Sequence, residues 1–149
     1  MPNWCLNHLH VSGPTEDLKR FKAQAVGVPP WSSASQEEIE KPNPLNFHSL
    51  RPIPPEVLAM DYHDTGYNWE VANWGCKWGA VETELIEQRN GGLVYEFGSA
   101  WSPPVQLLTH LGPQWPELNF LLEYEEPGMG FQGVCKVHGD EVEDCCRNL

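Results

Sequence analysis

The sequence has few basic residues and no long hydrophobic run. Its 9 Lys and Arg residues stand against 21 Asp and Glu residues, which gives a formal net charge of -12 at pH 7. Nucleic acids are bound through Lys and Arg that neutralise phosphates, so this charge disfavours nucleic acid as a partner. No window approaches the roughly 18 apolar residues of a membrane-spanning helix, and the start, MPNWCLNHLH, lacks the basic and apolar regions of a secretory signal. We therefore expect a cytoplasmic protein that has no membrane partner.

Cysteine is scarce. The 5 cysteines are an odd number and are scattered along the chain, so reduced thiols are expected rather than a disulfide framework. A zinc site would have to combine the C-x-x-H pair Cys135 and His138 with the adjacent Cys145 and Cys146. Adjacent cysteines rarely both point at one ion, because structural zinc needs four ligands in a tetrahedron. We expect no metal and no cofactor.

Catalytic motifs are also missing. The sequence contains no G-x-S-x-G nucleophile elbow, no H-E-x-x-H helix, no P-loop and no G-x-G-x-x-G turn. An active site that is assembled in space from distant residues stays open, because catalytic triads do not depend on sequence spacing. The sequence therefore favours a protein that is not an enzyme, without deciding the question.

What the chain does contain is enough apolar material for one core. It has 149 residues, of which 40% are hydrophobic, and it includes 7 Trp, 5 Phe and 4 Tyr. A chain of this length buries about 70% of the surface that its unfolded form exposes, so we expect one domain over residues 1–149. Acidic residues gather near the C-terminus, and residues 138–149 are expected to form an acidic tail.

Periodicity predicts a strand followed by a helix at the start of the chain. Residues 4–11 alternate between two faces, which is typical of a strand. This alternation places Cys5 on the face opposite His8 and His10, so the three side chains are not expected to share a metal site. An apolar stripe with helical spacing follows between residues 15 and 27.

A proline-rich segment follows the helix. Residues 28–68 contain seven prolines and little periodicity, so we expect a long, mostly irregular insertion. Part of it should be ordered, because residues 45–54 carry several apolar anchors, and Pro54-Pro55-Glu56 suits the start of a short helix. The segment 31–40 fits either a mobile tip or a helical insert, and the conformation of residues 28–44 stays open.

The second half of the chain predicts a hairpin and a helix. Asn90-Gly91-Gly92 has strong turn chemistry and separates two alternating segments, so residues 79–99 predict a β-hairpin. Ser102 followed by two prolines predicts a helix over 103–111, which Gly112-Pro113 should end.

Two further strands complete the pattern. Residues 118–125 alternate, and residues 131–137 are expected to return as an extra C-terminal edge strand. The order strand, helix, insertion, hairpin, helix, strand is the split βαβ pattern of a ferredoxin-like α+β sandwich. We therefore predict an antiparallel sheet with two helices on one face.

Five sequence blocks resemble a known family. In chain order they are MPNWCLNHLHVSG, LNFHSLRPIPPEVL, NWGCKWG, FGSAWSPPVQLL and LLEYEEPGMGFQG. They resemble the successive blocks of the YubB-type ferredoxin-like domain family of phage- and plasmid-encoded bacterial proteins. This resemblance implies the fold, a bacterial or phage setting and a cytosolic location, but no activity. The family more often carries Thr where this chain has Cys76, which argues against a family-wide catalytic thiol at that position.

A set of Trp, Asn, Lys and Glu residues is the candidate binding site. NWGCKWG places Lys77 between two indoles, and a cation–π contact is worth about 0.5–2 kcal/mol. If the strand ends converge, such a lining suits a small polar ligand. Because aromatic clusters more often pack a core, the pattern leaves open whether these residues form a site. The candidates are Asn3, Trp4, Asn7, Trp69, Glu70, Asn73, Trp74, Lys77, Trp78, Trp101, Glu123 and Glu126.

Two functions remain in view. The first is a non-enzymatic protein-binding module of phage or plasmid type, with a host protein as candidate partner. In one form of this hypothesis, the acidic surface of the module imitates nucleic acid. The alternative is a small-molecule-binding protein or an enzyme that uses a Trp-lined pocket with Lys77 and a glutamate. Single-stranded nucleic-acid binding on the open sheet face is disfavoured by outward glutamates. The sequence does not indicate the oligomeric state. The expected outward glutamates are Glu82, Glu84, Glu96, Glu123 and Glu125.

Overall fold

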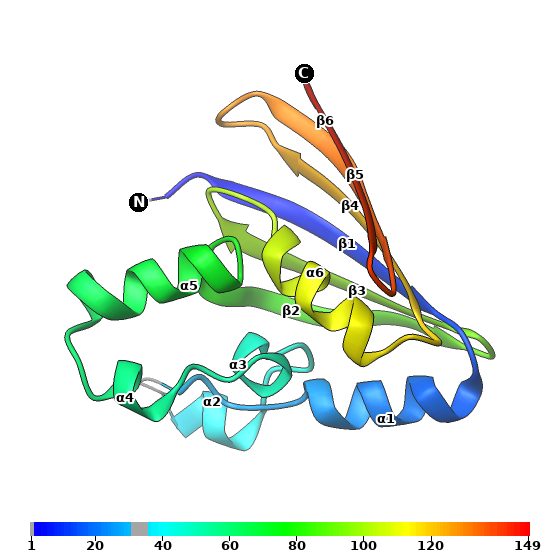
Figure 1. Cartoon of the computed structure of the whole chain (residues 1–149), viewed down its shortest axis with the longest axis horizontal. Helices are drawn as coiled ribbons and strands as arrows, with labels where there is room; N and C mark the ends of the chain where they lie inside the picture. Colours follow the sequence, from blue (N-terminus) through cyan, green and yellow to red (C-terminus); the bar gives the residue numbers. More distant parts are fainter. Residues whose placement is uncertain (1, 31–35) are drawn as a thin grey trace.

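The computed structural model describes residues 2–30 and 36–149. In this part of the chain, six strands form one antiparallel sheet in the order β2-β3-β1-β4-β5-β6 (Figure 1). The strands are β1 (Trp4–Ser12), β2 (Lys77–Arg89), β3 (Gly92–Ala100), β4 (Asn119–Glu126), β5 (Phe131–His138) and β6 (Glu141–Asn148). The helices are α1 (Thr15–Ala25), α2 (Gln36–Glu40), α3 (Phe47–Leu50), α4 (Pro55–Leu58), the π-helical turn η1 (Tyr62–Gly66), α5 (Tyr67–Asn73) and α6 (Val105–Gln114).

The first four strands and two of the helices make the ferredoxin-like core. The helices α1, α5 and α6 lie on one face of the sheet and leave the other face uncovered (Figure 1). α1 connects β1 to the hairpin β2–β3, and α6 connects that hairpin to β4, which returns beside β1. The α+β sandwich predicted from the order of the elements is confirmed. β5 and β6 extend the sheet beyond β4.

The inward-facing residues of β1 and the apolar stripe of α1, both predicted from the sequence, form the centre of the core. Every second residue of β1, starting at Cys5, is buried toward the helices, and His8 and His10 point to the uncovered face. Phe21 of α1 packs edge-on against Trp115 at 5.4 Å and against Phe120 at 5.6 Å between ring centroids. Full burial of such a side chain contributes about 1.5–3 kcal/mol, so the apolar periods fix which faces meet.

The insertion is more regular than the sequence predicts. Residues 28–68, expected to be mostly irregular, contain α2, α3, α4 and η1. These elements span only four or five residues each, so helical periodicity cannot develop in them. The short helix after Pro54 is confirmed as α4, and the four anchors of residues 45–54 are buried in the core. α2 lies within the 31–40 segment, whose first half is outside the described residues. The anchors are Leu45, Phe47, Leu50 and Ile53.

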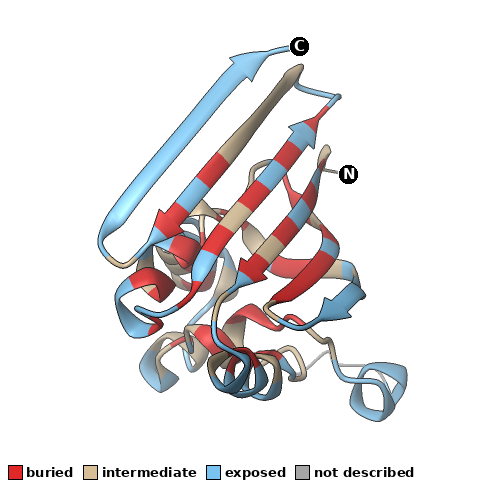
Figure 2. Cartoon of the chain, turned by 90° about the vertical axis from the view of Figure 1, so that its right-hand side faces the viewer, coloured by how far each residue is buried: buried red, intermediate tan, exposed pale blue. Residues whose placement is uncertain are grey.

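Two predicted boundaries are wrong. α6 does not end at Gly112-Pro113 but continues to Gln114, and Gly112 packs against the Gly139 carbonyl of the β5–β6 turn. Residues 138–149 do not form a tail, because residues 141–148 are β6, which pairs with β5 in an unbroken antiparallel register. All of β6 is exposed (Figure 2), so neither burial nor alternation marks it in the sequence. None of the helices in the described ranges has the length and apolar character needed to cross a membrane.

Candidate functional site

A buried hydrogen-bond network joins β1 to β3 beneath the helices. The Asn7 side chain is fully buried, and its Nδ2 donates to Ser99 Oγ at 2.9 Å and to the Cys5 carbonyl at 3.1 Å. Ser99 Oγ donates to the Ser102 carbonyl at 2.7 Å, and the Ser102 hydroxyl donates to the Gly75 carbonyl. Buried polar groups are costly unless they are bonded. The network therefore ties β1, β3 and the turn before β2 into one unit.

Glu70 is a second fully buried polar residue, and it comes from α5. Its Oε1 accepts the Tyr62 hydroxyl at 2.7 Å and the Trp78 backbone N–H at 2.8 Å. Burial and then the hydrogen bond to Glu70 raise the pKa of the Tyr62 hydroxyl above its ordinary value. Trp78 has a φ of 72°, a left-handed conformation that costs a residue other than glycine about 1–2 kcal/mol. The bond from Glu70 supports that strained start of β2.

Glu126 is a further fully buried polar residue, and it lies at the end of β4. One carboxylate oxygen accepts the Met129 N–H at 3.1 Å, and the other is buried without a hydrogen-bond partner among the described residues. Its negative charge acts on Cys5, which lies at the start of β1. Glu126 thus holds the β4–β5 turn and borders the network of Asn7.

The cysteine thiols near these carboxylates are not activated as nucleophiles. Burial raises the pKa of Cys5 to about 12, with a smaller contribution from the charge of Glu126. Burial, followed by the charge of Glu70, also raises the pKa of Cys76 well above its ordinary value. Because only the thiolate is nucleophilic, both thiols are inert at neutral pH. The arrangement supports a structural role for Cys5 and Cys76.

Three indoles form what we call the aromatic end, defined by Trp4, Trp78 and Trp101. Trp4 lies opposite Ala100 across β1 and β3, and the Trp4 and Trp78 rings are 6.3 Å apart. Lys77 Nζ lies 3.9 Å from the Trp78 ring centroid. Trp78 and Trp101 remain 47% and 43% exposed, although they are large apolar side chains. No ion pair of the described residues includes Lys77.

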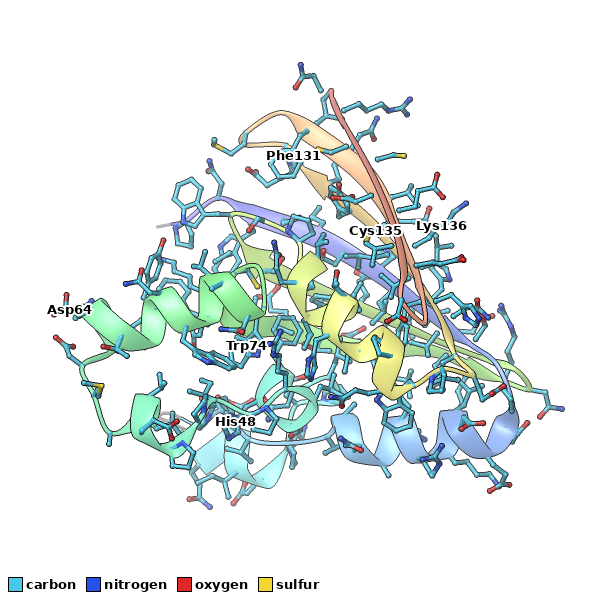
Figure 3. All side chains as sticks on the ribbon, viewed as in Figure 1. His48, Asp64, Trp74, Phe131, Cys135 and Lys136 are labelled. Atoms are coloured by element: carbon cyan, nitrogen blue, oxygen red, sulfur yellow. The ribbon has the colours of Figure 1, made fainter. Side chains whose placement is uncertain are left out.

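Other candidates pack the core or end a helix. Trp74 is buried, donates from Nε1 to the Arg51 carbonyl at 3.1 Å, and contacts Phe47 and Trp69 edge-on (Figure 3). Asn73 ends α5 and donates to the Trp69 carbonyl at 2.9 Å. These side chains stabilise the packing of α5 on α3 and do not line an opening with Lys77.

The uncovered face of the sheet, which we call the open face, carries charged side chains. Across the strands, Glu84, Glu96, His8 and Glu123 stand in successive register positions from β2 to β4. His8 Nε2 lies 3.4 Å from Glu96, and His10 Nε2 lies 2.9 Å from Glu123. All five glutamates that were expected to point outward are exposed. The register places Glu84, Glu96, Glu123 and Glu125 on the open face, and Glu82 lies in the irregular part of β2.

A shallow hollow of about 650 Å³ lies on this face over β1, β4, β5 and β6. Apolar side chains and charged side chains of both signs line it. Within the described residues, no three His, Cys, Asp or Glu side chains group closely enough to hold a metal ion. The vicinal cysteines considered for zinc alternate along β6, so they point to opposite faces of the sheet. Residues lining the hollow include Leu6, His8, Glu123, Glu125, Val134 and Arg147.

The sequence-derived site is therefore divided among four environments. Asn7, Glu70 and Glu126 lie buried beneath the helices, and Trp69, Asn73 and Trp74 belong to α5 and the core. Trp4, Trp78, Trp101, Lys77 and Asn3 meet at the aromatic end, where the Trp101 N–H donates to the Asn3 carbonyl at 2.9 Å. Glu123 is the remaining candidate, and it lies on the open face beside His10.

The residues that the candidate set missed differ in whether the sequence marks them. His8 and His10 lie two apart on one strand and face the same side, and Glu96 stands in the outward set on the neighbouring strand. Ser99 bonds to Asn7 because β1 and β3 pair over a long sequence separation. Tyr62 bonds to Glu70 because η1 turns the chain back onto α5, and no period in the sequence marks that turn. Strand alternation could therefore have identified the histidines, but not Ser99 or Tyr62.

Comparison with known proteins places this geometry in a described fold. Residues 76–148 match the family model described as a ferredoxin-like domain in Api92-like protein. The crystal structure of the protein api92 from Yersinia pseudotuberculosis aligns with a TM-score of 0.73 and 11% sequence identity, over 100% of this chain and 99% of that one. At this identity the likeness shows the fold alone. No curated protein sequence matches the chain. Neither match carries the YubB name or states a phage or plasmid origin.

Proposed function

We propose that this chain is a non-enzymatic protein-binding module whose contact surface is the open face. The observation that carries the proposal is that the helices cover one side of a wide sheet and leave the other side bare (Figure 1). This bare side is hollowed, and charged side chains line the hollow. Apolar Leu6 is 53% exposed on this face and provides a central apolar contact. Protein interfaces commonly combine an apolar centre with a polar rim.

The charge of the face indicates what kind of partner it suits. The chain has a net charge of -12, and the row Glu84, Glu96 and Glu123 crosses the open face. Electrostatic complementarity therefore favours a partner that presents Lys and Arg. The resemblance to proteins of mobile elements makes a host protein our proposed partner.

The acidic row does not favour imitation of nucleic acid. His8 interrupts the row, and Glu96 and Glu123 each pair with a histidine. A phosphate backbone presents an unbroken series of negative charges. We therefore propose an ordinary charged interface in place of phosphate mimicry.

The alternative of a Trp-lined pocket has less support. It requires Lys77 beside a carboxylate and an open cavity. Glu70 and Glu126 are instead buried and engaged with backbone N–H groups, and Lys77 Nζ contacts the Trp78 ring. A general acid or base must reach a substrate, so this arrangement does not supply the chemistry of that alternative.

The test compares two variants with equal charge change. Glu123→Lys/Glu125→Lys alters the open face, and Glu56→Lys/Glu117→Lys alters exposed residues of α4 and the α6–β4 loop. Each is used with the wild type as immobilised bait in a bacterial lysate, and every captured protein is purified and its Kd measured. We expect the Kd to rise at least tenfold for the open-face variant and to stay within about twofold for the control. Equal affinity for both variants would contradict the proposal.

A further inference from the structure

The two edges of the sheet are built differently. β2, at one edge, pairs irregularly with β3, with register shifts at three places. Glu82 in β2 has a φ of 48°, and the Asn43 side chain donates to the Ala80 carbonyl at 3.0 Å. Bulges and covering segments are the usual means by which proteins prevent an edge from pairing with another strand. The β2 edge is therefore protected.

β6, at the other edge, has none of these protections in the described chain. It pairs with β5 over eight consecutive positions without a register shift, and it contains no proline, glycine or lysine. Every residue of β6 is exposed, and the strand stands at the outside of the sheet (Figure 2). One row of backbone N–H and C=O groups is thus available for an additional strand.

The geometry of a two-fold axis limits how two copies of β6 could pair. Antiparallel strands at a sheet edge are related by an axis perpendicular to the sheet, which keeps each side chain on its own face. Residues opposite one another must point to the same side, so only registers in which one residue lies opposite its own copy are possible. β6 therefore has a small set of registers to choose from.

Charge selects one of these registers. When Cys145 lies on the axis, Glu143 of each copy lies opposite Arg147 of the other, and the remaining central pair joins Asp144 to Cys146. When Asp144 lies on the axis, Glu141 of each copy lies opposite Arg147 of the other, but the two aspartates face each other directly, and like charges at that position destabilise a strand pair. When Cys146 lies on the axis, Arg147 lies opposite Cys145 and no ion pair forms.

We propose that β6 is a self-association edge, at which two copies of this chain pair their β6 strands antiparallel about a two-fold axis at Cys145. The two sheets then continue into one another, with both open faces on the same side, and two Glu143–Arg147 ion pairs flank the axis. Both cysteine thiols on the axis lie on the open face, where Cys145 and Arg147 already line the hollow. This inference does not depend on the binding function proposed for the open face.

Charge reversal gives a sharp test of the register. Glu143→Arg alone places like charges opposite each other in a pair of identical copies, and so does Arg147→Glu alone. A mixture of these two chains restores both opposite-charge pairs. Sedimentation velocity over a concentration series should show wild-type dimers, at least tenfold weaker self-association for each single variant, and recovery of dimers in the equimolar mixture.

The control is Glu141→Arg, which makes the same charge change on the same strand at a position that faces no charged residue in this register. We expect it to dimerise at least as tightly as the wild type. Circular dichroism melting of each variant alone shows that the fold is kept, which is expected because every substituted side chain is exposed.

A second measurement crosslinks the two residues that lie on the axis. Directly opposite residues of an antiparallel pair have Cα atoms about 4.5–5.5 Å apart, which suits a disulfide. Diamide accepts the two electrons and two protons released when two thiols form a disulfide. We expect diamide to link wild-type and Cys146→Ser chains into dimers, and to leave Cys145→Ser chains unlinked.

Several outcomes would overturn the inference. They are a wild-type chain that stays monomeric at millimolar concentration, a Glu143→Arg chain that dimerises as well as the wild type, and a mixture of the charge-reversed chains that stays monomeric. Crosslinking through Cys146, or occupation of β6 by a strand of a different protein in place of a second copy, would also overturn it.

Discussion

Single residues with buried polar side chains carry much of the specificity of this fold. Asn7, Glu70 and Glu126 are each fully buried, yet each is hydrogen-bonded to a residue outside its own element. The sequence marks such residues only as polar side chains in apolar surroundings, which suits a ligand site as well as a structural network. Their partners decide between these roles, and the partners are found by the tertiary fold.

Replacing Asn7 should test this structural role. Asn7→Ala removes the donor to Ser99 and leaves a small cavity between β1 and β3, so we expect a loss of about 2–3 kcal/mol in the free energy of unfolding. Urea unfolding measures the change. Asn119→Ala, at an exposed position of β4, should change stability by less than about 0.5 kcal/mol. Equal losses in the two variants would show that the network contributes nothing.

His48 of α3 should make stability depend on pH. Its Nδ1 accepts the Ile53 N–H at 2.9 Å, and burial lowers the pKa of the ring below its ordinary value of 6.5 (Figure 3). A lowered pKa in the folded state means that the unfolded chain binds more protons, so stability is full above pH 6.5 and falls as the pH decreases below it.

The measurement compares wild type with His48→Ala between pH 7.5 and pH 5. We expect the variant to be about 1 kcal/mol less stable at pH 7.5, because a buried hydrogen bond is lost, and to show a smaller decrease toward pH 5. Burial, followed by the charge of Arg51, also lowers the pKa of His110, so the decrease will not vanish. A steeper slope in the variant would contradict this assignment.

Among the elements, the β4–β5–β6 extension depends on one glycine. The Tyr124 hydroxyl of β4 crosses over Gly133 of β5 and donates to Asp144 of β6 at 2.6 Å. A Cβ at Gly133 would lie 2.3 Å from that hydroxyl. Tyr124 therefore connects three strands only because the middle one carries no side chain at this point.

Gly133→Ala should destabilise the protein by about 1–3 kcal/mol, because the added methyl group displaces the Tyr124 ring from its bond to Asp144. Thermal unfolding followed by circular dichroism measures the loss. Combining Gly133→Ala with Tyr124→Phe removes the nearest atom that the new Cβ would meet, together with the bond to Asp144 that both changes disrupt, while the ring carbon at 2.5 Å and the Cys145 carbonyl at 2.6 Å remain. The two changes together should thus cost clearly less than the sum of the separate losses, and strict additivity would contradict the steric explanation.

Elements with a long apolar period were predictable, and elements without one were not. β1, α1 and the β2–β3 hairpin carry a strand alternation, a helical apolar stripe and a turn sequence, each of which can be recognised within a short segment of the chain. The short helices of the insertion are too brief for a period to appear, and β6 has no buried face at all. β6 forms a strand because it pairs with β5, and strand pairing is not a local property of the sequence.

At the scale of the whole molecule, excess negative charge should oppose folding. Glu84 and Glu96 lie directly opposite each other in β2 and β3, within a chain of net charge -12. Raising the salt concentration from about 10 mM to about 1 M shortens the screening length from about 30 Å to about 3 Å. We expect the Tm to rise by about 2–4 °C, equivalent to about 1 kcal/mol for a chain of this length.

A charge-matched pair of variants locates the effect. Glu84→Gln/Glu96→Gln removes the facing charges, so it should raise the Tm in low salt and reduce the response to salt. Glu56→Gln/Glu117→Gln removes two exposed charges that do not face each other and should have a smaller effect. A Tm that falls with added sodium chloride would show that ion pairs such as Arg89 with Glu87 outweigh the repulsion.

The sequence by itself determined the order of the core elements and the face that each presents, because apolar periods of 2 and 3.6 residues are local and state which side must be buried. It also identified side chains that gather at the aromatic end, since the ends of β1, β2 and β3 carry the tryptophans.

The tertiary structure alone decided which candidates are bonded in the interior, which remain exposed, and which strand forms the free edge. Asn7 is structural because Ser99, distant in the sequence, accepts its hydrogen bond, and Glu70 is structural because Tyr62 of η1 and Trp78 of β2 fold back onto α5 and donate to its carboxylate. The Lys77 ammonium contacts an indole instead of a carboxylate. The physical reason is that burial and pairing depend on contacts between distant segments, and no local pattern records them.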